Sequence, residues 1–351
     1  MNCAPSQKPS LLLGKRFAYG FGGGEVPLTT TAVEARVSFE EKIRKGLYVF
    51  EDVPCFCGST NGVLLASRER LGLYYPLVAC RNCGILRASP RMTAASYSQF
   101  YDSEYWPLQI LVDHESDWYF GKKLEEGERI RDYVLDHWPS RNAPKIVFEV
   151  GCDTGMKLVP WKNLGCEVSG VDCNVRRIER GKELTGITSL HVGGMEQFIE
   201  KGQQADLVIL SHVLEHFLGL DEALQNVRRI LSPSGCVYVA LPGTFWWIRE
   251  KCCGDILVLL TIAHTYQFSL ATLRYVLECE GFELVHGTEE IVSLFRMGDQ
   301  FRGRDAVPEG EFQRVMTYLR GCELRYLPRR LLGRTAEWLG VKQSLRRLLR
   351  R

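Results

Sequence analysis

Residues 146–172 read IVFEVGCDTGMKLVPWKNLGCEVSGVD, and this stretch decides the fold. An apolar run meets an acid at Glu149, a turn with glycines at 151 and 155 follows, and a segment with helical spacing comes next. A strand that stops at glycines and restarts as a helix leaves backbone N–H groups pointing at one place, which favours a polar or anionic ligand there. A second apolar strand ends in Asp172, about 20 residues after the first glycine, as in nucleotide-binding βαβ units whose second acid binds ribose hydroxyls.

The turn argues against a dinucleotide. The fingerprint G-x-G-x-x-G lets the backbone approach a pyrophosphate, but here Asp153 takes the middle glycine position and the third glycine is missing. A carboxylate that faces a pyrophosphate repels it. A cofactor with a ribose, a charged amine and a sulfonium, but no phosphate, is accommodated more easily, and that describes S-adenosylmethionine.

Five segments across residues 145 to about 290 resemble, in order, the successive motifs of class I S-adenosylmethionine-dependent methyltransferases. They are EVGCDTG at 149–155, GVD at 170–172, ADLVILSHVLEHF at 205–217, ILSPSGCVYVALPG at 230–243 and HTYQFSLATLRYVLECEGFEL at 264–284. The resemblance implies an α/β fold with a Rossmann-like sheet. The alternative is an ordinary βαβ unit without a cofactor.

Alternating strands and helices predict a parallel sheet covered on both faces, with the ligand at the carboxyl ends of the strands. Strands are expected at 145–150, 167–171, 187–191, 206–211, 235–241 and 282–286. Helices are expected near 156–164, 174–184, 195–200, 221–231 and 269–280. A further helix over 118–138 is expected to precede the first strand and to lie over the cofactor. The resemblance also implies that the last strand runs antiparallel.

The resemblance implies a set of residues that bind the cofactor. These are Glu149, Gly151, Asp153, Gly155, Asp172, Cys173, Met195, Glu196, Ser211 and His212. Asp172 is expected to accept both ribose hydroxyls. Asp153 replaces a glycine of the family, but Asp tolerates left-handed backbone angles, and its carboxylate is a candidate partner for the cofactor amine. Gly194 stands where the family often has an acid near adenine, so Met195 is expected to contact the ring and Glu196 to serve as acceptor.

Methyl transfer from a sulfonium is an in-line displacement, to which an enzyme contributes alignment and removal of a proton. Candidate bases are His212, His216 and His264, with Tyr266 near the last of them. For each histidine, a structural role is the alternative. The segment H-x-x-E-H at 212–216 also matches an inverted zinc-protease signature, but it follows a buried strand and lacks a further ligand set, so we favour helix-start packing or substrate contact.

Four cysteines predict a structural zinc site. Cys55 and Cys57 lie in PCFCGS, Cys80 and Cys83 lie in ACRNCG, and 22 residues separate the two pairs. A glycine follows each pair, which suits a turn that aims both sulfurs at one tetrahedral ion. The first pair departs from the common C-x-x-C spacing, so four reduced thiols in a small β-rich module remain the alternative.

Many bacterial methyltransferases from sugar and polysaccharide pathways resemble this order of a cysteine-pair ribbon, an aromatic stretch and a cofactor domain. The aromatic stretch here covers 89–106. Such rings stack on a sugar or base, or else pack two domains together. The apolar segment between Pro242 and Ala263, with Trp246 and Trp247, is interpreted either as a lid over the substrate or as a dimer contact. The oligomeric state stays open.

Length and charge describe a soluble globular protein, with 351 residues and a net charge of +2. No general affinity for nucleic acid follows from that charge. The first 13 residues are too weakly apolar for a secretory signal, and the apolar run at 256–263 is far shorter than a transmembrane segment. The 13 cysteines, an odd number, are not a disulfide framework, so a cytoplasmic location is expected.

Four regions are expected: an irregular arm and helix at 1–48, a zinc-ribbon-like module at 49–105, the cofactor domain at 106–295 and a basic helical extension at 296–351. From 313 to the end, eleven Lys or Arg residues against two Glu leave nine positive charges. This basic end is expected to be a solvated helix, or to contact an anionic membrane surface or an acidic partner such as a nucleotide- or lipid-linked sugar.

The predicted function is methyl transfer from S-adenosylmethionine to a small molecule, with a sugar or sugar-nucleotide hydroxyl or carbon as the acceptor that the resemblance favours. The alternative is a catalytically idle module that binds the cofactor and acts through its ribbon and tail. Asp153, Gly194 and the C-x-C pair keep that alternative open.

Overall fold

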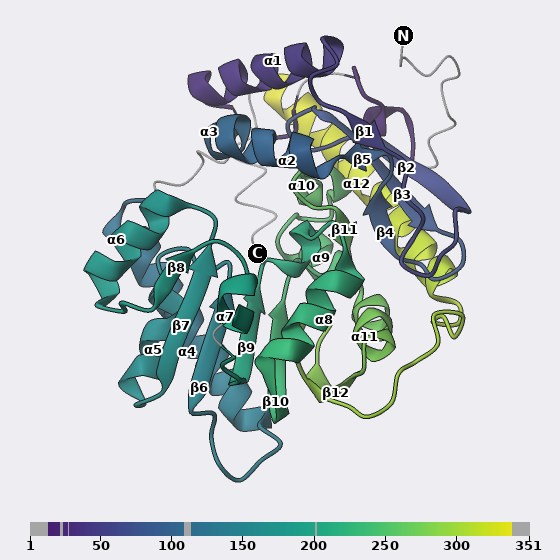
Figure 1. Ribbon diagram of the computed structural model, residues 1–351. Coiled ribbons are helices and arrows are strands. Elements are labelled where there is room, and N and C mark those ends of the chain that lie inside the picture. Colours follow the sequence, from purple (N-terminus) through teal and green to yellow (C-terminus); the bar gives the residue numbers. More distant parts are fainter. Residues whose placement is uncertain (1–12, 22–23, 27, 109–113, 201, 339–351) are drawn as a thin grey trace.

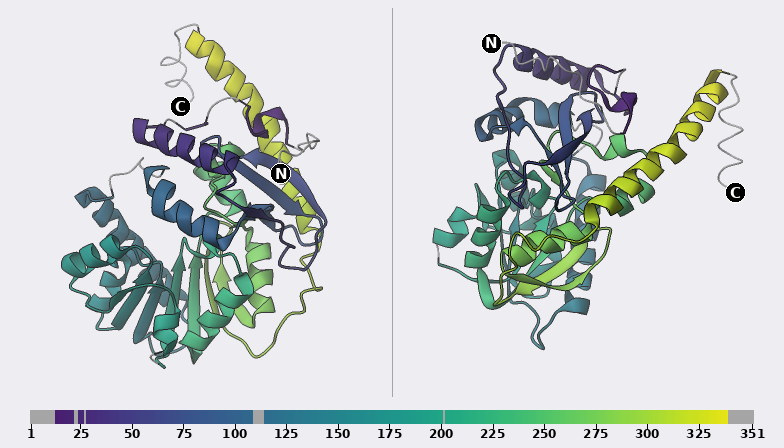
Figure 2. Two further views of the ribbon diagram at one scale, coloured as in Figure 1. Left: turned by 45° about the horizontal axis from the view of Figure 1, so that its top comes forward. Right: turned by 90° about the vertical axis from the view of Figure 1, so that its right-hand side faces the viewer.

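The computed structural model describes residues 13–338, except 22–23, 27, 109–113 and 201. Figure 1 shows two layers: a twisted sheet with helices on both faces below, and a smaller layer of short strands and helices above. The long C-terminal helix runs behind the upper layer, and the side view in Figure 2 shows it extending away from the sheet.

The lower layer contains a seven-stranded sheet in the order β12-β13-β10-β9-β6-β7-β8. Its strands are β6 (Ile146–Val150), β7 (Glu167–Asp172), β8 (Leu190–Val192), β9 (Ala205–Ser211), β10 (Leu231–Ala240), β12 (Phe282–Gly287) and β13 (Val292–Met297). β13 pairs antiparallel with both β10 and β12, and the remaining pairs are parallel. The last strand is therefore antiparallel as expected, but it is β13, which the sequence analysis did not predict, and not the strand at 282–286.

Three helices of this layer begin at polar caps. The side chains of Ser116, Asn174 and Ser269 accept backbone N–H groups at the starts of α4, α6 and α11. The elements are α4 (Asp117–His137), η3 (Met156–Leu158), α5 (Val159–Asn163), α6 (Val175–Thr185), α7 (Glu196–Glu200), η4 (Leu214–His216), α8 (Leu220–Ile230) and α11 (Leu270–Cys279). The helices predicted for this domain are therefore present, with ends shifted by at most one residue, and the first of them divides into η3 and α5.

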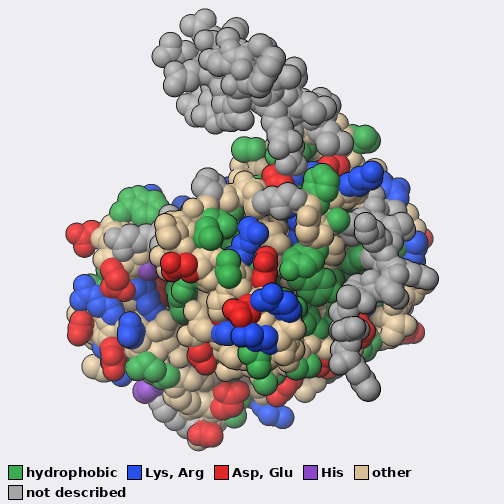
Figure 3. All heavy atoms as spheres, turned by 90° about the horizontal axis from the view of Figure 1, so that it is seen from above, with side chains coloured by type: hydrophobic (Ala, Val, Ile, Leu, Met, Phe, Trp, Pro, Cys, Tyr) green, Lys and Arg blue, Asp and Glu red, His purple; other side chains and the backbone are tan. Residues whose placement is uncertain are grey.

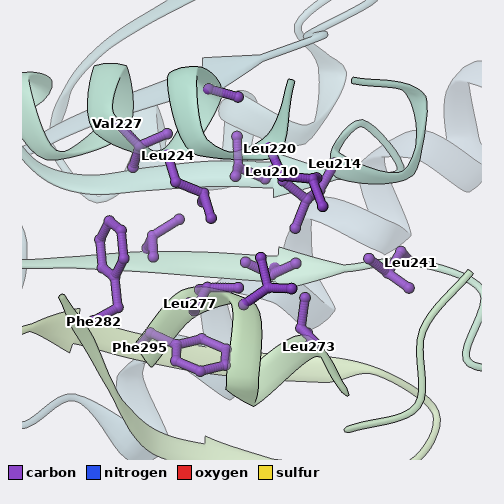
Figure 4. Close-up of a cluster of buried hydrophobic side chains, with 14 of the residues drawn as sticks. Leu210, Leu214, Leu220, Leu224, Val227, Leu241, Leu273, Leu277, Phe282 and Phe295 are labelled. Carbon is purple, nitrogen blue, oxygen red and sulfur yellow. The ribbon is translucent and has the colours of Figure 1, made fainter. Parts of the chain in front are cut away.

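Alternating residues of β9 cover the two faces of the sheet. Val208 and Leu210 pack with α7, α8 and α11 in one core, part of which Figure 4 shows. Leu207 and Ile209 pack with α4, α5 and α6 in another core. This two-residue period buries both faces of a parallel sheet, so the open positions for a ligand are at the strand ends.

The upper layer is built from three separate parts of the chain. Its four-stranded antiparallel sheet has the order β11-β4-β3-β2, and β11 (Tyr266–Gln267) comes from the methyltransferase-like half of the chain. Its other elements are η1 (Lys15–Phe17), α1 (Thr30–Arg44), β1 (Phe50–Glu51), β2 (Gly62–Arg68), β3 (Tyr74–Cys80), β4 (Leu86–Ala88), β5 (Arg91–Met92), α2 (Ala94–Phe100), η2 (Tyr101–Tyr105), α3 (Trp106–Leu108), α9 (Thr244–Glu250), α10 (Ile256–Leu259) and α12 (Glu311–Trp338).

A buried ion-pair triad joins those parts. Arg16 near the start of the chain donates to Asp255 (2.8 Å) beside α10 and to both carboxylate oxygens of Glu323 on α12. One apolar core likewise contains residues from 13–108, 245–262 and 315–322. The N-terminal residues, the segment around α9 and α10, and the described part of α12 thus share one core.

Candidate cofactor and acceptor site

The turn after β6 contains three residues with left-handed backbone angles. They are Gly151 (φ 66°), Asp153 (φ 54°) and Gly155 (φ 68°), which confirms that Asp153 adopts this conformation. A Cβ at Gly151 would lie 2.5 Å from Cγ2 of Val213, so the turn packs closely against the segment after β9. β6 and β9 are neighbouring strands in the sheet. The chain continues from β6 to β7 on one side and from β9 to β10 on the other. Open α/β sheets bind ligands at the carboxyl ends of two such strands.

Asp172 ends β7 and is fixed beside this turn. Its Oδ2 accepts the N–H of Asp153 (2.9 Å), and its Oδ1 accepts the N–H of Asn174 (2.9 Å). Burial raises the pKa of Asp172, and the two N–H groups oppose that shift. Because each carboxylate oxygen has a further lone pair, Asp172 fits two ribose hydroxyls while the backbone holds it in place. The contact itself stays a prediction.

The carboxylate of Asp153 is paired within the protein. Arg177 on α6 donates to both of its oxygens, with Nη2 2.9 Å from Oδ2, and the hydroxyl of Tyr119 donates to Oδ2 at 3.0 Å. Burial raises the pKa of Asp153, but Arg177 outweighs burial and holds the pKa below its ordinary value. Asp153 therefore braces the turn against α4 and α6, and its contact with a cofactor amine stays a prediction. Neither Tyr119 nor Arg177 was predicted from the sequence.

Glu149 lies beneath the turn. Its side chain is fully buried, and the ammonium of Lys157 lies 2.7 Å from Oε1. Burial raises the pKa of Glu149 to about 7. Burial also disfavours the charge on Lys157, but Glu149 and Glu126 outweigh that effect and raise its pKa. A Cβ at Gly127 would lie 2.7 Å from Cα of Lys157, so α4 holds this buried pair closely. A role for Glu149 in cofactor binding stays a prediction.

The remaining predicted cofactor residues differ in exposure. Cys173 is exposed directly after β7, and Glu196 is exposed at the start of α7. Met195 is 5% exposed and belongs to the core on the α7 face of the sheet. Ser211 is buried at the end of β9, where its hydroxyl donates to Oε1 of Glu126 (3.1 Å). These positions surround the carboxyl ends of β7, β8 and β9.

Three histidines surround the carboxylate of Glu215 after β9. Nδ1 of His212 lies 3.6 Å and Nε2 of His264 lies 3.9 Å from its Oε1, and the His216 and His264 rings are 4.9 Å apart. Burial raises the pKa of Glu215, but the histidines outweigh burial and hold it at about 2. Burial and His216 lower the pKa of His264 to about 3. The structure thus brings together three of the four predicted catalytic residues.

Tyr266, the fourth, lies in β11. Its hydroxyl donates to the carbonyl of Leu218 (3.4 Å), and its ring stacks with Phe268. The neighbouring Thr265 donates its N–H (2.8 Å) and its hydroxyl (3.0 Å) to the carbonyl of Glu215. Tyr266 therefore belongs to the strand that joins the two layers, while Thr265 fixes the loop of His264 against η4.

The aromatic stretch takes part in both packing and the site. Tyr97 and Phe100 are buried in the core of the upper layer. Tyr101 begins the π-helical segment η2, a conformation frequent at functional sites, and its hydroxyl lies 3.1 Å from Nδ1 of His216. The ring of Tyr105 lies tilted against that of Tyr101, with ring centres 4.6 Å apart and 57° between the planes. Burial raises the pKa of Tyr105 to about 12, and the acids on both sides, at 172 and 215, add to that shift.

The segment between 242 and 263 contributes one ring to the same place. The ring of Trp247 on α9 lies edge-on to His212, with centres 5.8 Å apart. Ile248 is buried in the core of the upper layer, and Trp246 is half-buried beside Lys251. Trp247 therefore borders the histidine cluster, whereas α9 as a whole is anchored by packing.

The two cysteine pairs converge in the upper layer. Sγ of Cys55 lies 3.5 Å from Sγ of Cys83, Sγ of Cys57 lies 3.6 Å from Sγ of Cys80, and all four sulfurs lie within 4.8 Å of one another. The glycines after the pairs, at 58 and 84, have φ near 80°, as the predicted turns require. A tetrahedral zinc with Zn–S bonds of about 2.3 Å holds its sulfurs about 3.8 Å apart, so these residues fit that ion.

The described helices include none that is both long and apolar enough to cross a membrane. Figure 3 shows the molecule from above, and acidic and basic side chains are interspersed on the part of this face drawn in colour. The basic end at 345–351, expected to be a solvated helix or to contact an anionic membrane surface or an acidic partner, lies outside the described residues.

Comparisons with known proteins give the family of the lower layer. Residues 120–287 match the model of a methyltransferase domain family. Ubiquinone biosynthesis O-methyltransferase from Bartonella bacilliformis is 24% identical over 104 residues, which cover 28% of this chain and 42% of the relative. The human mitochondrial enzyme of the same name is 27% identical over 123 residues, 31% of this chain and 33% of the relative. This chain thus spans less than half the length of these curated relatives.

Solved structures give the same kind of match. The plantazolicin methyltransferase BpumL, in complex with S-adenosylhomocysteine, is 14% identical and covers 63% of this chain and 88% of its own, with a TM-score of 0.45. A methyltransferase from Archaeoglobus fulgidus is 22% identical and covers 48% of this chain and 75% of its own, with a TM-score of 0.37. The family match and the curated relatives thus support a class I S-adenosylmethionine-dependent methyltransferase domain over residues 120–287.

Proposed function

We propose that the chain transfers a methyl group from S-adenosylmethionine to a hydroxyl oxygen of a small molecule, such as a sugar or a sugar nucleotide. The main support is Asp172, an acid at the end of β7 that two backbone N–H groups hold in place beside the glycine turn. Transfer to oxygen is favoured because the matched curated relatives are named O-methyltransferases. The sugar class follows from the resemblance described above, and a carbon acceptor is the alternative within that class.

In this proposal, the acceptor lies between the cofactor turn and the histidine cluster. Bound S-adenosylmethionine supplies an electrophilic methyl group. Tyr101, Tyr105 and Trp247 line the acceptor side and exclude water, and the segment from 212 to 216 carries the groups that orient the hydroxyl. His212, whose side chain is 39% exposed, is the best-placed group to take the hydroxyl proton as the oxygen attacks in line.

We also propose that Cys55, Cys57, Cys80 and Cys83 hold a structural zinc ion. The support is the convergence of their four sulfurs and the left-handed glycine after each pair. The ion would close the turns that support the upper layer. None of the twelve described cysteines forms a disulfide, which supports our proposal of a reducing, cytoplasmic location. Contact of the basic tail with a membrane or with an acidic partner stays a proposal without structural support.

Calorimetry with two matched variants tests cofactor binding. Asp172→Ala is expected to weaken binding of S-adenosylmethionine and S-adenosylhomocysteine by about 100-fold, because charge-assisted hydrogen bonds to both ribose hydroxyls are lost. Asp206→Ala is the control, because Asp206 also accepts two backbone N–H groups, from Lys145 (2.8 Å) and Ile146 (3.1 Å), but at the amino ends of the strands, away from the proposed site. Equal binding by Asp172→Ala and the native chain would refute the assigned site.

Turnover with nucleotide sugars and other hydroxyl-bearing acceptors then tests the reaction. The expected result is methyl transfer to oxygen, with S-adenosylhomocysteine as the second product. A chain that binds the cofactor tightly but transfers no methyl group to any of these acceptors would instead support the catalytically idle binding module.

A further inference from the structure

The carboxylate of Glu215 is an unusual buried acid. Its side chain is 1% exposed, and among the described residues neither of its oxygens has a hydrogen-bond partner. The nearest imidazole nitrogens, from His212 and His264, lie at 3.6 Å and 3.9 Å, beyond hydrogen-bond length. An ionised carboxylate in such a place is costly unless a cation accompanies it. The arrangement therefore leaves a position between the carboxylate and the rings that suits a positive charge.

The side chains around that position form a set of metal ligands. Glu215, His216 and His264 each offer one ligand atom, and these atoms all lie within 4.8 Å of one another. Nδ1 of His216 donates to the carbonyl of Ala263 (2.9 Å), which leaves Nε2 with its lone pair. Metal-binding histidines usually have this arrangement, because the backbone partner fixes both the tautomer and the ring. The segment H-x-x-E-H at 212–216 supplies Glu215 and His216, and His264 from another loop completes the set of three ligands.

The geometry points to a binding site for one divalent first-row transition-metal cation, held by Glu215, His216 and His264. Metal–nitrogen and metal–oxygen bonds of about 2.0–2.2 Å bring two ligands on one ion to about 3.0–3.5 Å from each other, so the ligands need to move by less than about 1 Å. Two imidazoles and one carboxylate on one side of an ion leave further positions open. The site differs from the cysteine cluster in ligand chemistry and in its place beside the methyltransferase domain.

The role of this ion rests on the proposed function, although its binding does not. The site adjoins Tyr101 and His212, on the acceptor side of the cofactor turn. A cation there polarises the O–H bond of the acceptor. The proton passes to the imidazole of His212, the oxygen forms a bond to the methyl carbon, and the carbon–sulfur bond breaks to release S-adenosylhomocysteine.

Cobalt binding by the full chain tests the site. Co²⁺ is added to metal-stripped native protein, Glu215→Gln, His264→Ala and the matched control His137→Ala, and bound cobalt is counted after dialysis. His137 is a half-buried histidine on α4 that stacks on His286, outside the cluster. We expect each ligand variant to bind one Co²⁺ less than the native chain, or to bind it at least about tenfold more weakly. His137→Ala is expected to bind as the native chain does. The thiolate-to-cobalt absorption from the cysteine cluster should be the same in all four proteins.

Equal cobalt stoichiometry and affinity in the native chain, Glu215→Gln and His264→Ala would overturn the proposal, and so would a native chain that binds cobalt only through thiolates. Circular dichroism of each variant shows whether it is folded, and the isosteric Glu215→Gln preserves the shape of the site. Calorimetry with S-adenosylmethionine on the same proteins separates the two proposals. A native chain that binds cobalt at this site but ignores the cofactor would refute the proposed function and leave the metal site intact.

Discussion

The cofactor turn and the Glu215 cluster lie at the carboxyl ends of neighbouring strands, yet they are assembled differently. The turn is held by residues close in sequence, since Asp153, Asp172 and Arg177 lie within one βαβ unit. The Glu215 cluster needs His264 from a distant loop and Tyr101 from the upper layer. In our proposal, a local cofactor site thus lies beside an acceptor side that depends on long-range packing. Perturbations of the upper layer should therefore separate the two.

Loss of the cysteine cluster should have the largest effect on stability. Cys80→Ser together with Cys83→Ser removes two ligands of the proposed zinc, and we expect the free energy of unfolding to fall by about 4–5 kcal/mol, because loss of a structural metal is among the most destabilising changes. The affinity for S-adenosylmethionine should change by less than about threefold, because the cofactor turn is local. Urea unfolding and calorimetry measure the two quantities.

Cys166→Ser is the control for that double variant. Its Sγ is half-buried and donates to the carbonyl of Pro144 (3.3 Å), a role that a serine hydroxyl can take over. This change should cost less than about 1 kcal/mol. If the double variant lost cofactor affinity in proportion to its stability, the two regions would not be separable as proposed.

Breaking the pair of Arg177 with Asp153 should have the next largest effect. Arg177→Met leaves the partly buried carboxylate of Asp153 without its cation, and we expect a loss of about 3 kcal/mol together with weaker cofactor binding, because this carboxylate braces the turn. Arg296→Met is the matched control, since the pair of Arg296 with Glu283 (2.6 Å) is exposed and should contribute less than about 1 kcal/mol. Equal losses in the two variants would contradict a bracing role for Arg177.

The upper layer also contains a buried acid that makes stability depend on pH. Glu69 is fully buried and accepts the N–H groups of Leu71 (2.7 Å) and Leu73 (3.0 Å), and burial raises its pKa to about 7. Because the folded pKa lies above the unfolded one, the stability from its protonated form is present below the unfolded pKa of about 4.5 and is lost as the pH rises through 7.

We therefore expect Glu69 to account for a decrease of about 2 kcal/mol in the stability of the native chain between pH 5 and pH 8. This part of the decrease should be absent in Glu69→Gln, which stays neutral. Urea unfolding of both proteins at three pH values isolates Glu69, because Glu149, whose pKa is shifted in the same direction, is present in both. Parallel pH profiles for the two proteins would contradict this account.

The smallest effect is expected at the contact between the layers. Tyr101→Phe removes the hydroxyl beside His216, and Tyr97→Phe removes a hydroxyl that donates to the carbonyl of Ile262 (3.1 Å). Each should cost about 1 kcal/mol of stability. Only Tyr101→Phe should also raise the KM for the acceptor by several-fold, without a change in the affinity for the cofactor. Identical kinetics of the two variants would place Tyr101 outside the acceptor site.

The sequence by itself determined the cofactor turn and the βαβ units around it. The glycine turn, the acid at 172 and the alternating apolar runs of the βαβ units are local patterns, because strand and helix periods and turn chemistry act between near neighbours. Both cysteine pairs were recognisable for the same reason, since each pair is followed by its own glycine turn. The strand Val292–Met297 was missed because it follows β12 directly as a hairpin partner, outside the alternation of strands and helices.

Only the tertiary structure decided the acceptor side and the side chains that support the cofactor turn. Arg177, Lys157 and Tyr119 look like ordinary surface residues of helices in the sequence, and folding places them under and against the cofactor turn. The segments that contain Glu215 and His264 come together because β11 pairs with the sheet of the upper layer. Such contacts come from packing between parts of the chain that are far apart, and no local pattern of residues encodes them.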